Sequence, residues 1–114
     1  MSKTKWIRFA EDEAEILTAD NKIAVIEAEG KKICLTRFEE SWHAFAYKCP
    51  HASGIMSDGY VDTVGNVVCP VHRYKFSLKN GRNTSGEGYY LKVYPIEKRE
   101  DGYYIGMPAG LFGF

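Results

Sequence analysis

The sequence has no long hydrophobic run and no excess of charge of either sign. Its 15 basic residues balance 15 acidic ones, so the overall charge gives no electrostatic argument for binding nucleic acid. No apolar segment approaches the roughly 20 residues that cross a bilayer, and the opening residues Met1 to Lys5 do not lead into the apolar core of a signal peptide. We therefore expect a cytoplasmic protein that binds neither nucleic acid nor a membrane.

The sequence also lacks the usual motifs of an enzyme active site. It contains no paired nucleophile and base, no phosphate-binding loop and no dinucleotide fingerprint. With 114 residues, the chain is long enough for one packed domain but too short for a second, catalytic one. We therefore predict a protein with no catalytic residues of its own.

Cysteine is scarce, and the count of three is odd. An odd number fits a reducing compartment better than a framework of disulfides. Cys34 falls in the middle of a predicted strand with no other ligand nearby in sequence, so we interpret it as a small buried apolar residue. Cys49 and Cys69 are different, because each is followed closely by a histidine.

The residues with metal-binding chemistry form two short, matching segments. The first is Cys49-Pro50-His51, and the second, after seventeen intervening residues, is Cys69-Pro70-Val71-His72. Each segment offers one thiolate sulfur and one imidazole nitrogen. Together the two segments supply a complete set of four ligands. The third histidine, His43, lies outside this pattern and is predicted to be structural or exposed.

Two kinds of metal centre accept two sulfurs and two nitrogens. Structural zinc binds them tetrahedrally, but its usual spacing places both cysteines in one segment and both histidines in the other. Here each segment is mixed. A binuclear centre has two irons, so two mixed loops closing from opposite sides can supply both sulfurs to one iron and both nitrogens to the other. The pattern favours an iron-sulfur centre over zinc.

At this point the sequence resembles the Rieske family of ferredoxins. Residues 49–59 follow the first cluster-binding loop of that family, residues 68–76 follow the second, and Asn80-Gly81-Arg82 fits the segment after it. The resemblance extends from about Trp6 to Ile105. It implies a single Rieske 2Fe-2S domain over residues 1–114, with a core of about 6–106 and a C-terminal tail of 107–114.

The resemblance implies a fold and a cofactor. The expected fold is all-β, an antiparallel β sandwich or barrel with two cluster-binding loops at one tip. The expected cofactor is a Rieske-type 2Fe-2S cluster. Histidines in place of two thiolates make the centre less negative, which raises its reduction potential. The ligands implied by the motif are Cys49, His51, Cys69 and His72.

The resemblance also implies a function. We expect a small one-electron carrier that passes electrons from a flavin-dependent reductase to a terminal oxygenase or a similar acceptor. Two alternatives remain open. One is a non-redox interaction module stapled by zinc, and the other is an accessory small subunit of a nitrite-reductase-like enzyme. Such small subunits typically lack the four ligands, which this chain retains.

Several positions near the motif depart from other family members. Where Rieske proteins of respiratory and photosynthetic complexes have a serine and a tyrosine that donate hydrogen bonds to sulfur, this chain has Tyr74 and Phe76, which implies a reduction potential at the low end for Rieske centres. Those complexes also link the two loops by a disulfide. Gly54 and Val71 occupy the corresponding places here, so no such disulfide can form. Arg73 replaces a glycine that often follows the second histidine.

Short alternating segments separated by turn residues predict strands and very little helix. Residues 23–28 and 32–37 flank Glu29-Gly30-Lys31 and are expected to form a hairpin. Residues 41–47 carry bulky side chains on both faces, as a central strand does. The acidic stretch 11–15 could form one helical turn or a solvated loop, and we favour the loop. Further strands are expected at 6–9, 60–62, 66–68, 74–78, 91–97 and 103–105, with Pro95 indicating an edge or a bulge.

Overall fold

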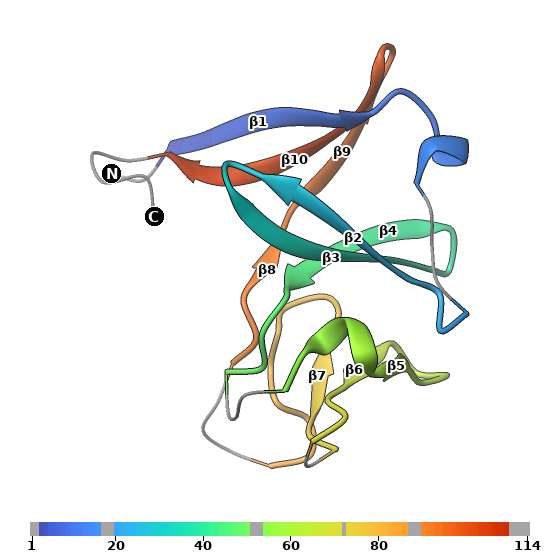
Figure 1. Ribbon diagram of the computed structural model, residues 1–114, viewed down its shortest axis with the longest axis vertical. Helices are drawn as coiled ribbons and strands as arrows, with labels where there is room; N and C mark the ends of the chain where they lie inside the picture. Colours follow the sequence, from blue (N-terminus) through green and yellow to red (C-terminus); the bar gives the residue numbers. More distant parts are fainter. Residues whose placement is uncertain (1–2, 17–19, 51–53, 72, 87–89, 110–114) are drawn as a thin grey trace.

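The computed structural model describes residues 3–16, 20–50, 54–71, 73–86 and 90–109. The described chain forms three antiparallel sheets and two short 3-10 helices (Figure 1), which confirms the predicted all-β class. The elements are β1 (Lys3–Ala10), η1 (Glu13–Glu15), β2 (Ile23–Ala28), β3 (Lys31–Phe38), β4 (Ser41–Ala46), η2 (Met56–Asp58), β5 (Tyr60–Val61), β6 (Asn66–Val68), β7 (Lys75–Ser77), β8 (Val93–Tyr94), β9 (Ile96–Arg99) and β10 (Gly102–Ala109).

The four-stranded sheet β2-β3-β4-β8 is the middle layer of the molecule. Successive side chains of a strand point to opposite faces, and in β3 both faces are buried. Ile33 and Leu35 belong to one apolar cluster, whereas Cys34 between them belongs to another. Strand β4 does the same with Ala44 and Phe45. This two-sided burial explains why residues 41–47 have bulk on both faces, and it confirms β4 as a central strand.

The three-stranded sheet β1-β10-β9 covers one face of the middle layer. Pro95 separates β8, which pairs with β4, from β9, which pairs with β10. The prediction of one strand over residues 91–97 is therefore wrong, because the chain passes from one sheet to the other at the proline. Strand β10 is longer than predicted and continues through Met107, which is buried, to Ala109 opposite Lys3.

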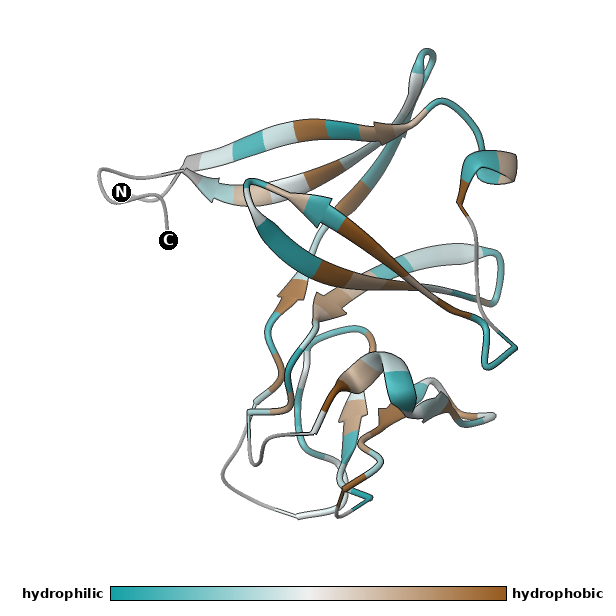
Figure 2. Cartoon of the chain, viewed as in Figure 1, coloured by the Kyte–Doolittle hydropathy of each residue, from teal (hydrophilic) through white to brown (hydrophobic). Residues whose placement is uncertain are grey.

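The small sheet β5-β6-β7, helix η2 and the two cysteine-bearing loops lie at the other end of the long axis, below the middle layer in Figure 1. Their apolar side chains pack against the lower face of the middle sheet in a cluster that includes Phe45, Met56 and Phe76. Figure 2 shows apolar residues along β2 and β3, two strands that contribute side chains to both clusters. The loops are thus built on a core of their own.

Local turn chemistry accounts for the remaining elements. The predicted hairpin of β2 and β3 is confirmed, and Glu29 and Gly30 both have positive φ angles in its turn, 54° and 75°. Of the two possibilities for residues 11–15, the structure has the single helical turn and not the favoured loop. Asp12 accepts a hydrogen bond from the Ala14 N–H at 2.9 Å and caps a 3-10 turn. No described helix is long and apolar enough to pass through a bilayer.

Candidate metal centre

The first cysteine-bearing loop leaves the end of β4. The N–H of Met56 donates to the carbonyl of Tyr47 at 2.7 Å, and the N–H of Cys49 donates to the carbonyl of Gly54 at 2.9 Å. A β-bridge also joins Lys48 and Ile55. Together these contacts hold the two ends of the loop close to each other. The Cys49 side chain is 5% exposed and points into the lower apolar cluster.

The second loop connects β6 to β7 and closes in the same way. The N–H of Cys69 donates to the carbonyl of Tyr74 at 2.9 Å, five residues further on, as Cys49 does to Gly54. A second bond runs from the Arg73 N–H to the Cys69 carbonyl at 3.0 Å. Cys69 is 1% exposed and lies in the same cluster as Cys49. The same backbone hydrogen bond, from the cysteine N–H to a carbonyl five residues later, therefore closes both loops.

The two loops touch through Gly54. A β-carbon added to this glycine would lie 2.6 Å from Val71 Cγ2 and 2.8 Å from Cys69 Sγ. These separations are well below the roughly 3.5–4.0 Å of ordinary contact between carbon atoms. Only glycine fits at this position without moving the sulfur of Cys69. Because Gly54 has no side chain, the two cysteine loops can pack directly against each other.

The structure brings together two of the four predicted ligands. Cys49 and Cys69 share one buried cluster, whereas His51 and His72 lie outside the described residues. Within the described ranges, no group of three or more histidine, cysteine or acidic side chains is arranged to hold a metal. Two buried sulfurs on touching loops are the donors that the sulfur side of a mixed-ligand iron-sulfur centre requires. The residues present fit a cluster, and the four-ligand set remains a prediction.

Arg73 adopts a backbone conformation that favours glycine. Its φ angle is 58°, in the left-handed region that residues with a β-carbon rarely adopt. Arg73 nevertheless holds the turn that returns the chain to β7, and its side chain is exposed. The positive φ angle of Arg73 therefore strains the second loop.

Tyr74 and Phe76 follow the second cysteine loop, Tyr74 just before β7 and Phe76 within it. Phe76 is fully buried in the lower cluster and contributes only apolar contact. Tyr74 is half-buried, and its carbonyl accepts the Cys69 N–H. Phe76 and Cys69 therefore belong to the same buried cluster.

The remaining cysteine and histidine have structural surroundings. Cys34 is fully buried, and burial raises the pKa of its thiol to about 12, with the Asp58 carboxylate adding to the effect. Burial lowers the pKa of His43 below its usual value, Lys79 adds to this, and a hydrogen bond to the backbone of Leu78 opposes it. His43 therefore joins β4 to the turn after β7, in agreement with the structural role predicted for it.

Sequence reasoning missed two polar side chains that support the loops. Asn21 donates to the carbonyls of Ser57 and Gly59 at 2.7 and 2.8 Å, and so ties helix η2 to the start of β2. Asp62 accepts hydrogen bonds from the backbone of Asn66 and Val64 in the turn before β6. The spacing of Asp62 and Asn66 is a local turn signal. Asn21 gives no such signal, because its partners lie 36 and 38 residues away.

Comparison with known proteins identifies the family. A family model described as the Rieske 2Fe-2S domain matches residues 6–95. The chain belongs to this family. The ferredoxin component of a naphthalene 1,2-dioxygenase system from Pseudomonas putida is 31% identical to this Rieske chain over 94 residues, which are 82% of this chain and 86% of that protein.

A second relative comes from a different kind of enzyme. The NAD(P)H nitrite reductase of Emericella nidulans is 30% identical over 104 residues, which are 83% of this chain. The chain spans only 8% of the length of that protein. An alkene monooxygenase ferredoxin from Xanthobacter autotrophicus is also matched over 64% of its length. Similarity over part of these proteins therefore does not assign their activities to this chain.

Solved structures confirm the fold. A structure described as the small subunit of an NADH-dependent nitrite reductase from Mycobacterium tuberculosis superposes with a TM-score of 0.77 at 21% identity, covering 95% of this chain and 99% of the other. A chain in a complex of reduced oxygenase and oxidised ferredoxin of carbazole 1,9a-dioxygenase gives a TM-score of 0.71 at 20% identity, covering 88% and 91%. At these identities the likeness concerns the fold alone.

Proposed function

We propose that this Rieske chain is a one-electron carrier and that it binds a Rieske-type 2Fe-2S cluster through Cys49 and Cys69 on one iron and His51 and His72 on the other. The observation that carries the proposal is the pair of buried cysteines on matching loops that touch at Gly54. A bound cluster supplies one-electron oxidation and reduction, and the chain itself performs no further chemistry.

The residues around the cysteines suit such a carrier. Both sulfurs are shielded from water by a continuous apolar cluster, and a water-poor environment strengthens the electrostatic interactions of thiolates with iron. Each loop is closed by a hydrogen bond from the cysteine N–H to a carbonyl five residues away. Ligands fixed in this way change position little when the charge of the centre changes, which keeps the cost of electron transfer low.

The proposed partners are redox proteins. The naphthalene dioxygenase and alkene monooxygenase relatives are ferredoxin components of oxygenase systems, and this supports a terminal oxygenase as acceptor and a flavin-dependent reductase as donor. We place the protein in the cytoplasm, where cysteines stay reduced. The chain is then a component of a multicomponent oxidoreductase and not an enzyme by itself.

The first test is electron paramagnetic resonance of the purified protein after reduction with dithionite, together with iron, sulfide and zinc analysis. A rhombic signal with an average g below the free-electron value and about two irons per chain supports the proposal. A silent, colourless protein with one zinc would replace it by the zinc-stapled module.

The ligand assignment has matched controls within the chain, which has three cysteines and three histidines. His72→Ala and Cys69→Ala are expected to lose the Rieske signal and most of the iron. His43→Ala and Cys34→Ala remove the same residue types outside the motif and are expected to retain both. A His72→Ala protein with an unaltered spectrum would contradict the assignment.

A subunit of a nitrite-reductase-like enzyme is a second candidate, favoured by the 30% identity to the Emericella protein. The two functions differ in what the protein must bind. A free carrier passes electrons to an oxygenase from solution, whereas an accessory subunit forms a stable complex with its catalytic subunit. The two functions are distinguished by purifying the protein from its native cells at its natural expression level and applying size-exclusion chromatography. A carrier elutes alone, whereas a subunit elutes with the larger catalytic chain.

A further inference from the structure

The charges of the protein are unevenly distributed, although they sum to zero. Residues 45–94, which contain both cysteine loops, include six basic and three acidic residues. The rest of the chain includes nine basic and twelve acidic ones. The part of the molecule that holds the candidate metal centre is therefore the basic part, and this polarity is invisible in the net charge.

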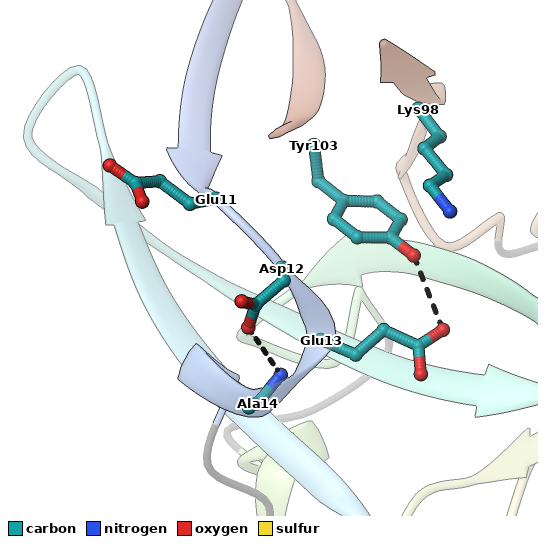
Figure 3. Close-up of a pocket in the computed structure, with 6 residues that line it drawn as sticks. All are labelled: Glu11, Asp12, Glu13, Ala14, Lys98 and Tyr103. Carbon is teal, nitrogen blue, oxygen red and sulfur yellow. Dashed lines mark hydrogen bonds between the residues drawn. The ribbon is translucent and has the colours of Figure 1, made fainter. Parts of the chain in front are cut away.

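The acidic part of the molecule satisfies many of its charges internally. A recess of about 640 Å³ beside η1 is bordered by Glu11, Glu13 and Lys98 (Figure 3). Its carboxylates have partners, since Glu13 accepts a hydrogen bond from the Tyr103 hydroxyl at 3.2 Å and forms an ion pair with Arg37 at 3.1 Å. Every ion pair formed by the described residues lies outside residues 45–94.

The basic residues beside the second cysteine loop are different. From Cys69 to Gly86 the sequence contains Arg73, Lys75, Lys79 and Arg82 and no acidic residue. Among the described residues, none of these four side chains forms an ion pair within 4.0 Å, and all four are exposed. Their charges are directed to solvent, where a binding partner can use them.

Strand pairing places several of these residues on one face. Phe76 pairs with Asn83, and both are buried. The flanking residues Lys75 and Arg82 therefore point the opposite way, to solvent. Arg82 also pairs with Tyr90, whose side chain shares its face and is 63% exposed.

Apolar exposure accompanies the charge. Val71, in the second cysteine loop, is 46% exposed, and Arg73 follows it two residues later. Interfaces between proteins commonly combine exposed aliphatic or aromatic residues with arginine and a polar rim. We name Val71, Arg73, Lys75, Arg82 and Tyr90 the basic face. It begins at the loop that carries Cys69 and extends along β7 to the Arg82–Tyr90 bridge.

We infer that the basic face is the docking surface for an acidic redox partner, a protein whose electron-transfer site is bordered by aspartate and glutamate side chains. The inference rests on the proposed function, because it places this surface next to the candidate metal centre. Complementary charges steer two proteins into the orientation that brings their redox centres together and raise the association rate most at low ionic strength.

Small redox reagents of opposite charge test the inference without knowledge of the partner. The reduced protein gives one electron to the anion hexacyanoferrate(III), which becomes hexacyanoferrate(II), or to the cation tris(phenanthroline)cobalt(III), which becomes the cobalt(II) complex. Stopped-flow oxidation is followed at several ionic strengths. For the wild-type protein we expect the rate with the anion to fall as salt is added and the rate with the cation to rise, despite the zero net charge.

Charge reversal on the face has a matched control elsewhere. Arg73→Glu/Lys75→Glu and Lys31→Glu/Lys98→Glu change the total charge by the same amount, but Lys31 lies in β3 of the middle sheet and Lys98 in β9 of the upper sheet. We expect the first variant to be oxidised by the anion about tenfold more slowly at low salt and the second within about twofold of wild type. Equal effects of the two pairs, or a wild-type preference for the cation, would overturn the inference.

A measurement that needs no redox chemistry separates failure of the inference from failure of the proposed function. On a sulfonate cation exchanger at neutral pH, we expect the wild type and the Lys31→Glu/Lys98→Glu variant to be retained and the Arg73→Glu/Lys75→Glu variant to flow through. If the protein transfers no electron to either reagent but all three proteins behave on the cation exchanger as expected, the proposed carrier function is refuted and the assignment of the basic face stands. Salt-sensitive self-association of the wild type would overturn the inference, because the acidic part of a second copy would then be the occupant.

Discussion

A single methyl group at Gly54 tests how closely the two cysteine loops must pack. In Gly54→Ala the new β-carbon would stand 2.6 Å from Val71 Cγ2 and 2.8 Å from Cys69 Sγ. Ordinary contacts begin near 3.5 Å, so the loops must separate by several tenths of an ångström or more. Overpacking of this kind costs about 1–3 kcal/mol.

The cost is measurable as a change in thermal stability. For a domain of about 100 residues each kcal/mol lowers Tm by roughly 4–8 °C, so Gly54→Ala is expected to melt roughly 5–20 °C below the wild type. Gly86→Ala is the matched control, because a β-carbon there meets nothing within 4 Å. We expect its stability to stay within about 0.5 kcal/mol of wild type.

A second substitution separates the effect on packing from the effect on the sulfur. In Gly54→Ala/Val71→Ala the contact with Val71 Cγ2 disappears, but the contact with Cys69 Sγ remains. We expect part of the stability to return, while the electron paramagnetic resonance spectrum and the iron content stay altered. A Gly54→Ala protein as stable as Gly86→Ala, with a wild-type spectrum, would refute the close packing on which this reasoning depends.

Three further predictions follow from backbone strain and hydrogen bonding. Arg73→Gly relieves a φ angle of 58° and is expected to raise the free energy of unfolding in urea by up to about 1 kcal/mol; a destabilised variant would contradict the strain. Glu39→Asn/Glu40→Gly supplies residues suited to the φ angles of 50° and 68° in the β3–β4 turn and is expected to raise Tm by several degrees, about 1 kcal/mol. Burial acts to raise the pKa of Asp62, but hydrogen bonds from Asn66 and Val64 outweigh it, and the pKa is lowered in the folded protein. The contribution of Asp62 to stability is therefore complete above the unfolded pKa of about 3.9, and it is lost as pH falls through the lower folded value. In Asp62→Asn that acid-dependent loss should disappear from denaturation curves measured between about pH 2 and 6, and an unchanged pH profile would refute it.

Local signals in the sequence were sufficient for the parts of the fold that depend on neighbours along the chain. Gly30 in the segment Glu29-Gly30-Lys31 predicts the hairpin of β2 and β3 because glycine readily adopts a positive φ angle, and in the structure that angle is 75°. The two-faced bulk of residues 41–47 predicts a central strand. For residues 11–15 the sequence left a helical turn and a loop open, and the turn forms with the Asp12 cap and with Glu15, whose carboxylate accepts the Glu11 N–H.

Long-range pairing accounts for what the sequence did not reveal. Pro95 predicts an interruption, but nothing near it indicates that β8 joins β4 while β9 joins β10. The end of β10 lies opposite Lys3 across more than a hundred residues of chain. At the candidate metal centre the motif identifies Cys49 and Cys69, yet the contact of Gly54 with Cys69 arises only after both loops have folded.

The position of β4 links these observations to electron transfer. Its side chains alternate between the upper cluster, through Ala44, and the lower cluster, through Phe45, so the strand is held on both faces. The chain leaves this fixed strand and reaches Cys49 within three residues of its end. A ligand loop attached to a doubly packed strand has little freedom to relax when charge arrives, because any shift would disturb both clusters. The central placement of β4 therefore suits the proposed role of Cys49 as a sulfur ligand in a one-electron carrier.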